Sequence, residues 1–229
     1  MLMPVDSQHI TLLHWAALND RVEVAGLLVE GGVPVDSVGG RLASTALHWA
    51  AHSGSLSVLA LLVSRAARLD LPDTDGCLPI HVAAGQGSTT CLVYMVARGQ
   101  HVDTPDREGR TPLMIALARS DSPDTIRQLV RLGASITSLD LAHNNPLHWA
   151  VYSGRARTVA SLVNISQQHF CQQRISWEDK NNQGKSALDI INREKRHLLA
   201  GLPGQVKHYV RKDILLRKLN NPLRNKQHL

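Results

Sequence analysis

Four histidines recur along the chain at nearly equal spacing, which raises the question of a shared metal ion. They are His14, His48, His81 and His148. Each belongs to its own repeat of the sequence, so packed helices would hold neighbouring rings about 10 Å apart, too far for one ion to be shared. We therefore expect no metal site, and we expect each histidine to hydrogen-bond the backbone of a turn.

The other reactive residue types give no catalytic pattern. Cys77, Cys91 and Cys171 share no close spacing, which favours inert packing residues over nucleophiles, a disulfide scaffold or a zinc module. The sequence contains no G-x-S-x-G, no phosphate-binding glycine loop and no H-E-x-x-H. We expect a protein that is not an enzyme by itself and that needs no cofactor.

Tryptophans and small polar residues give a candidate binding surface. The residue after the recurring histidine is tryptophan at Trp15, Trp49 and Trp149, and one helical turn later on the same face come Asn19, Ser53, Gln86, Arg119 and Ser153. An indole is a large amphipathic surface that often anchors an interface, and neighbouring amides and hydroxyls can bond an extended peptide. The alternative is that each indole fills space between adjacent helices. The residues alone favour that packing role.

A recurring phrase indicates which elements position these residues. TLLHWAA at Thr11–Ala17 returns as TALHWAA at Thr45–Ala51, LPIHVAA at Leu78–Ala84, TPLMIAL at Thr111–Leu117, NPLHWAV at Asn145–Val151 and SALDII at Ser186–Ile191. A period of about 33 residues with T-P-L-H-x-A is the signature of ankyrin repeats. Aromatic residues are 3% of the chain and hydrophobic residues 43%, which favours helices packed on helices over a β-sandwich.

Each of the first five copies of the phrase predicts a helix followed by a second helix. Thr11, Thr45 and Thr111 stand at helix N-caps, and prolines occupy the first turn of several helices. The second helices are predicted at Val22–Leu28, Leu56–Ser64, Thr89–Ala97, Thr125–Leu132 and Arg157–Val163. The sequence thus predicts an all-α ankyrin-repeat solenoid of about six repeats whose first helices and loops face a concave groove.

The chain divides into three parts. We predict an N-terminal extension at 1–10, the ankyrin-repeat domain at 11–200 and a basic C-terminal helical tail at 201–229. A longer interval between the fifth and sixth phrases predicts a polar insertion at about 164–180, which we expect to be a mobile loop.

The net charge of +6 lies in the segment from Arg193 onward, and the body of the chain is nearly neutral. This distribution disfavours nucleic-acid binding. The basic tail either caps the stack as a short amphipathic helix, contacts an anionic membrane surface, or is a solvated end. No apolar run is long enough to span a bilayer and no signal peptide is visible, so we expect a cytoplasmic monomer.

Four segments resemble the N-terminal ankyrin domain of the DHHC-type palmitoyltransferases known as huntingtin-interacting proteins. They are TLLHWAALNDRVEV, SVGGRLASTALHWAAHSGSLSV, DTDGCLPIHVAAGQGSTTCLVYMVARGQHVD and REGRTPLMIALARS. The resemblance runs from about Ser7 to Leu219 and includes LLRKL at Leu215–Leu219, but it departs at the insertion after Val163. The Asp-His-His-Cys catalytic motif and its Cys-rich zinc module are absent from the sequence, so the chain as given lacks the catalytic half.

The resemblance implies a peptide-binding module that recruits protein substrates for S-palmitoylation. In that family a tryptophan packs against the proline of a short disordered segment, and an asparagine on the preceding repeat bonds the adjacent glutamine. Trp49 and Asn19 match these positions, with Trp15, Ser53 and Gln86 as further groove residues. The implied partners are proteins with Gln-Pro-containing segments, and the implied location is the cytosol or the cytosolic face of Golgi membranes. The alternative function is a general ankyrin scaffold that binds a folded protein.

Overall fold

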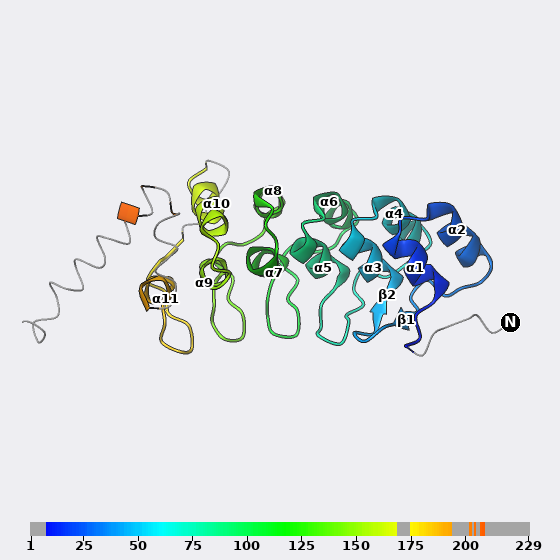
Figure 1. The fold of residues 1–229 in the computed structure, drawn as a ribbon, viewed down its shortest axis with the longest axis horizontal. Coiled ribbons are helices and arrows are strands. Elements are labelled where there is room, and N and C mark those ends of the chain that lie inside the picture. The colour runs from blue at the N-terminus through cyan, green and yellow to red at the C-terminus, as the bar shows by residue number, and fades with distance from the viewer. Residues whose placement is uncertain (1–7, 169–174, 194–201, 203, 205–206, 209–229) are drawn as a thin grey trace, which may run out of the picture.

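The computed structural model describes residues 8–168 and 175–193, together with 202, 204, 207 and 208. Within these residues the chain forms stacked helix pairs in two layers (Figure 1). One layer, the inner one, contains α1 (Leu12–Leu18), α3 (Ala46–Ser53), α5 (Pro79–Gln86), α7 (Pro112–Arg119), α9 (Pro146–Tyr152) and α11 (Ala187–Arg193). The outer layer contains α2 (Val22–Glu30), α4 (Leu56–Ser64), α6 (Thr89–Ala97), α8 (Pro123–Arg131) and α10 (Ala156–Ser166).

The structure confirms the mostly helical repeat architecture. The loops that join one pair to the next project as fingers from the inner layer (Figure 1). The predicted N-caps at Thr11, Thr45 and Thr111 are N-caps in the structure. Residues 1–7, the stretch 169–174 within the predicted insertion and most of the predicted basic tail lie outside the described residues.

Alanine pairs allow the inner helices to pack closely. Ala50, Ala51, Ala83 and Ala84 have no exposed surface, and Ala17 is equally buried. Small side chains at these positions let the backbones of α1, α3 and α5 approach, and the larger aliphatic residues then fill the space between the layers at interior density. The result is one continuous apolar core that runs the length of the stack.

The first finger contains a short hairpin that the sequence did not predict. Strands β1 (Val38–Gly39) and β2 (Ser44–Thr45) pair in antiparallel fashion. A Cβ atom on Gly39 would lie 2.6 Å from the carbonyl oxygen of His9, so only glycine lets the N-terminal backbone pass this closely. Gly40 follows with φ of +77°, a conformation that glycine adopts without strain. The Gly-Gly pair therefore shapes this finger and seats residues 8–10 against it.

The recurring histidines bridge neighbouring turns, as predicted. In His14 the Nδ1 atom accepts the N–H of Thr11 at 3.1 Å, and Nε2 lies 2.9 Å from the carbonyl oxygen of Ser44 in the first finger. His48, His81 and His148 repeat this pattern with the backbone of later fingers. Because Nδ1 accepts a backbone N–H, Nε2 carries the proton and the ring is neutral.

Candidate functional site

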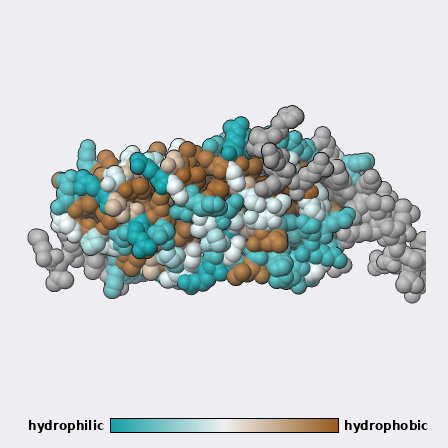
Figure 2. Space-filling view, turned by 180° about the vertical axis from the view of Figure 1, so that it is seen from behind, coloured by the Kyte–Doolittle hydropathy of each residue, from teal (hydrophilic) through white to brown (hydrophobic). Residues whose placement is uncertain are grey.

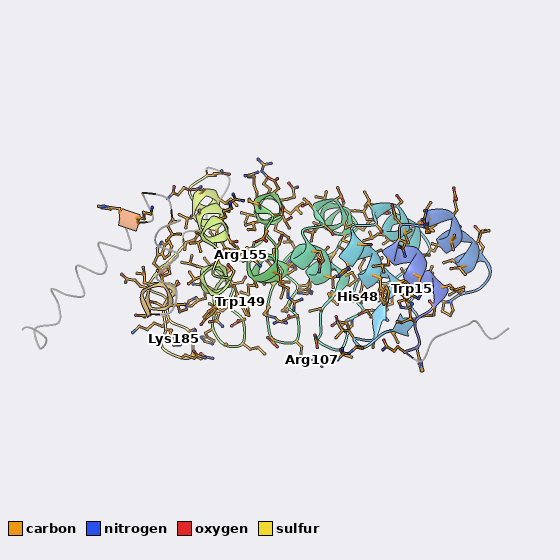
Figure 3. All side chains as sticks on the ribbon, in the orientation of Figure 1. Trp15, His48, Arg107, Trp149, Arg155 and Lys185 are labelled. Atoms are coloured by element: carbon orange, nitrogen blue, oxygen red, sulfur yellow. The ribbon has the colours of Figure 1, made fainter. Side chains whose placement is uncertain are left out.

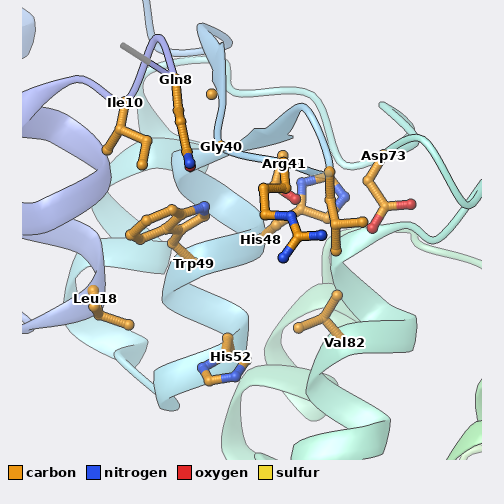
Figure 4. Close-up of a pocket in the computed structure, with 13 residues that line it drawn as sticks. Gln8, Ile10, Leu18, Gly40, Arg41, His48, Trp49, His52, Asp73 and Val82 are labelled. Carbon is orange, nitrogen blue, oxygen red and sulfur yellow. The ribbon is translucent and has the colours of Figure 1, made fainter. Parts of the chain in front are cut away.

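A cavity of about 700 Å³ opens where the first finger faces the inner helices α1, α3 and α5. Its lining comprises Gln8, Ile10, Leu18, Gly39, Gly40, Arg41, Leu42, Ser44, His48, Trp49, His52, Asp73 and Val82. Figure 4 shows Gln8 and Ile10 on one side of the Trp49 ring and Arg41 on the other. The cavity therefore combines an aromatic surface, aliphatic walls and charged or polar groups, which is the usual composition of a binding site.

Trp49 forms the aromatic wall and is held in place by other rings. Its indole is half-buried, with its centroid 5.7 Å from that of Trp15 and 5.4 Å from that of His14 in edge-to-face contacts. On the finger side, a Cβ atom on Gly40 would lie 3.6 Å from Cζ2 of Trp49. The glycine thus leaves the ring uncovered where a side chain would overlie it, and the ring position is fixed before any ligand arrives.

Trp149 occupies the same phrase position in α9, and its surroundings differ in one decisive way. Its Nε1 donates a hydrogen bond to Oδ2 of Asp140, nine residues earlier, at 3.0 Å. At the equivalent place before Trp49 stands Gly40, which has no side-chain acceptor. Among the described residues Trp49 has no hydrogen-bond partner for its indole N–H. Trp49 therefore offers an unused donor to the cavity, whereas Trp149 uses its donor within the fold.

The finger turns explain why an acidic residue normally stands where Gly40 does. In each of the later fingers an Oδ1 atom accepts two backbone N–H groups of the turn. The residues that supply it are Asp73, Asp106, Asp140 and Asn181. The first finger replaces this side-chain support with the hairpin. Aligning the repeated phrases would have revealed Gly40 as the exception, but the sequence analysis did not single it out.

The comparisons with known proteins agree with this architecture. The family described as "Ankyrin repeats (3 copies)" matches residues 2–73 and 66–140. The chain belongs to the ankyrin-repeat family.

Similar curated proteins support the resemblance drawn from the sequence. The human palmitoyltransferase ZDHHC17 is 40% identical over 83% of this chain, and the Drosophila melanogaster palmitoyltransferase Hip14 is 38% identical over 81%. The mouse palmitoyltransferase ZDHHC13 is 33% identical over 85%. The chain spans 29% of the length of the human ZDHHC17 protein, 28% of Hip14 and 30% of mouse ZDHHC13. The match is therefore to the ankyrin region of these proteins.

The five predicted site residues of the ankyrin domain all lie within the described residues, and only Trp49 lines the cavity. Trp15, which Figure 3 shows on α1, is 48% exposed, and its ring lies edge-to-face with that of Trp49. Asn19 is exposed at the end of α1, where its Nδ2 donates to the carbonyl oxygen of Trp15 at 2.9 Å. The Oδ1 atom of Asn19 has no partner among the described residues.

Ser53 and Gln86 lie farther from this arrangement. The Ser53 hydroxyl lies 3.3 Å from the carbonyl oxygen of Ala17 and 3.1 Å from that of Trp49, so it links α3 to α1. Gln86 is exposed at the end of α5. The structure thus groups Trp15 and Trp49, and adds Gln8, Arg41 and His52, which sequence reasoning missed because they come from the N-terminal extension, the finger and a phrase position that it did not consider. The cavity also includes Val82, which occupies the phrase position of Trp49 in the third repeat.

The two described thiols, those of Cys77 and Cys91, are unsuited to nucleophilic chemistry. Burial raises the pKa of Cys77 to about 11 and that of Cys91 to about 11, so both are protonated at neutral pH. Cys171 lies outside the described residues. In the part of the chain that the structure describes, no cluster of three or more His, Cys, Asp or Glu side chains could hold a metal ion. No helix within the same residues has the length and apolar character needed to cross a bilayer.

Proposed function

We propose that this ankyrin domain binds a short, extended protein segment with a Gln-Pro pair, and so recruits protein substrates for S-palmitoylation by a DHHC-type acyltransferase. The observation that supports it most is the exposed face of Trp49, which has an unused indole N–H inside a preformed cavity. The second support is the similarity to the ankyrin region of proteins named as palmitoyltransferases.

The chemistry of proline fits this wall of the cavity. A proline ring lies flat on an indole and has little conformational freedom to lose, because its φ angle is fixed. Proline also holds the preceding residue in an extended conformation. The carbonyl oxygen of that residue is then available to accept a hydrogen bond from Nε1 of Trp49.

The side chain of Asn19 has one hydrogen-bonding atom available for the ligand glutamine that precedes the proline. Its Nδ2 is engaged with the carbonyl oxygen of Trp15, so its Oδ1 is the available atom. The side-chain NH₂ of a ligand glutamine would donate to that oxygen. A contact of this size gives weak and reversible binding, and tethering to a catalytic unit would raise the local substrate concentration to about the millimolar range.

A peptide titration tests this proposal. A fluorescent Gln-Pro peptide should bind the wild-type chain with micromolar affinity, as judged by anisotropy, and Trp49→Ala should abolish binding. Trp149→Ala is the matched control, because it removes an indole from the same phrase position outside the cavity. A peptide with Ala in place of Pro should also lose affinity. Unchanged binding in Trp49→Ala, with both variants folded by circular dichroism, would discard the site.

A second function, a scaffold for a folded protein, is favoured by the finger before α9. Leu139 is 53% exposed and Leu141 is 72% exposed, and exposed leucines on a projecting loop suit contact with a folded surface. If this function holds, Leu141→Ser should release the folded partner while Trp49→Ala retains it. Gln-Pro peptides should then show no affinity.

A further inference from the structure

Arg41 lines the cavity and forms no ion pair within the part of the chain that the structure describes. It lies on the first finger directly after Gly40, is exposed, and extends its guanidinium into the cavity on the side of His52 and Val82 (Figure 4). Among the described residues it has neither an ion pair nor a hydrogen-bond partner.

Other finger arginines are used within the fold. Arg107 stands at the corresponding place of a later finger, and its Nη1 donates to the carbonyl oxygen of Thr74 at 2.6 Å (Figure 3). The Nε atom of Arg110 lies 2.7 Å from Oδ2 of Asp106. Unlike these two arginines, Arg41 does not stabilise its own finger through its guanidinium, so that group is available to a ligand.

The remaining titratable groups of the cavity form no ion pair with Arg41. Asp73 is 5% exposed, and its Oδ1 accepts the N–H groups of Asp75 at 2.9 Å and Cys77 at 2.8 Å. His48 has both ring nitrogens engaged with backbone, and His52 is exposed beside Val82. The cavity thus presents a free guanidinium, which is a planar set of donors that matches a carboxylate in two parallel hydrogen bonds.

We propose that the bound segment carries an aspartate or glutamate close to its proline, and that this carboxylate pairs with Arg41. The inference rests on the proposed function, since it names the ligand class of the same cavity. A sphere of that volume is roughly 11 Å across, which is the length of about three residues of an extended chain. The acidic residue therefore lies within about three residues of the proline that contacts Trp49.

The expected effect on affinity is moderate because the guanidinium is solvent-exposed. A pair of this kind should make the acidic peptide about threefold to tenfold tighter than its neutral counterpart at low salt. The preference should shrink between about 0.01 M and about 0.15 M ionic strength, where the screening length falls from roughly 30 Å to roughly 8 Å.

The test uses the full chain and a set of fluorescent Gln-Pro peptides. Each peptide carries Glu or Gln at one position within three residues of the proline, on either side. In wild type, Glu should be preferred over Gln at one or more positions. Arg41→Gln should remove the preference, so that the Glu-containing and Gln-containing peptides bind this variant with equal affinity, and Arg41→Glu should favour a Lys-containing peptide instead. Arg107→Gln is the matched control and should keep the wild-type preference.

The outcomes separate the two proposals. If Gln-Pro peptides bind and lose affinity in Trp49→Ala but show no preference for Glu at any position, the acidic specificity is wrong and the peptide-binding function stands. A preference that persists in Arg41→Gln also overturns the assignment. If no peptide binds the wild-type chain, both proposals fail.

Discussion

Trp49 and Trp149 have the same residue type and phrase position, yet their indoles have different chemical roles. The Nε1 atom of Trp149 is bonded to Asp140, and the guanidinium of Arg110 lies 5.9 Å from its ring centroid. Trp49 faces a glycine instead. The sequence predicted where both tryptophans lie on their helices. The family resemblance pointed to Trp49, but the repeated phrase did not show which indole has a free donor, because that depends on the residue that the adjacent finger places against the ring.

Asn19 and Ser53 should respond differently to truncation. Asn19→Ala removes the free Oδ1, so a Gln-Pro peptide should lose about 1 kcal/mol of binding free energy, or about fivefold in affinity. Ser53→Ala should leave the affinity unchanged, because its hydroxyl is engaged between α1 and α3. Anisotropy titrations of both variants check this. A loss of affinity in Ser53→Ala equal to that in Asn19→Ala would place the serine in the site after all.

At the scale of elements, the sequence predicted the limits of two outer-layer helices and missed those of two others. The predicted helices at Leu56–Ser64 and Thr89–Ala97 have these limits in the structure. Helix α8 begins two residues earlier than expected, at Pro123, because Oγ of Ser122 accepts the N–H of Thr125 at 3.4 Å. Helix α10 continues to Ser166, within the stretch predicted as an insertion, and buries Ile165 at 3% exposure.

The buried histidines that join neighbouring fingers should make stability depend on pH. Burial lowers the pKa of His48, His81 and His148 below the ordinary value of 6.5. As the pH falls through about 6.5, the unfolded chain binds protons that the folded chain excludes, so the free energy of unfolding decreases. The loss is at most about 1.4 kcal/mol per histidine for each pH unit, and it continues until the pH passes below the folded-state pKa values.

Thermal melts between pH 7.5 and pH 5 check this expectation. The midpoint temperature of unfolding should fall as the pH is lowered. In His81→Gln this temperature should depend less on pH, because the variant lacks one of the buried rings. His143→Gln is the control, since His143 is exposed on a finger. Equal pH dependence in wild type and His81→Gln would exclude the buried ring as a source of the effect.

At the scale of the whole molecule, the cavity beside Trp49 lies at one end of the stack. Its lining comes from residues 8 to 82, and Trp149 lies far along the chain of helices (Figure 3). Apolar side chains gather over the N-terminal half of the face seen in Figure 2. Large apolar residues that are exposed on α1 and α2 include Leu12, Val24 and Leu27, at 49%, 47% and 70%. No periodicity in the sequence places the cavity at this end, because every repeat contains the same phrase.

In a solenoid each repeat contacts only its neighbours, so a destabilising substitution should affect its own repeat and the adjacent ones. Leu47 and Leu147 occupy the same phrase position in α3 and α9, and both are fully buried. Truncating either to Ala removes a core side chain and should cost about 2–5 kcal/mol. Leu147→Ala should therefore loosen α9 and its neighbours but leave Gln-Pro peptide affinity within about twofold, because no lining residue lies nearby.

Leu47→Ala should weaken both stability and peptide binding, because α3 carries Trp49 and His52. Hydrogen exchange should report faster exchange around α9 in the first variant and around α3 in the second, and anisotropy should report the affinity. If Leu147→Ala lowered the affinity for the peptide as strongly as Leu47→Ala does, the repeats would be folding as one cooperative unit. The cavity would then depend on the whole stack and not on its first units alone.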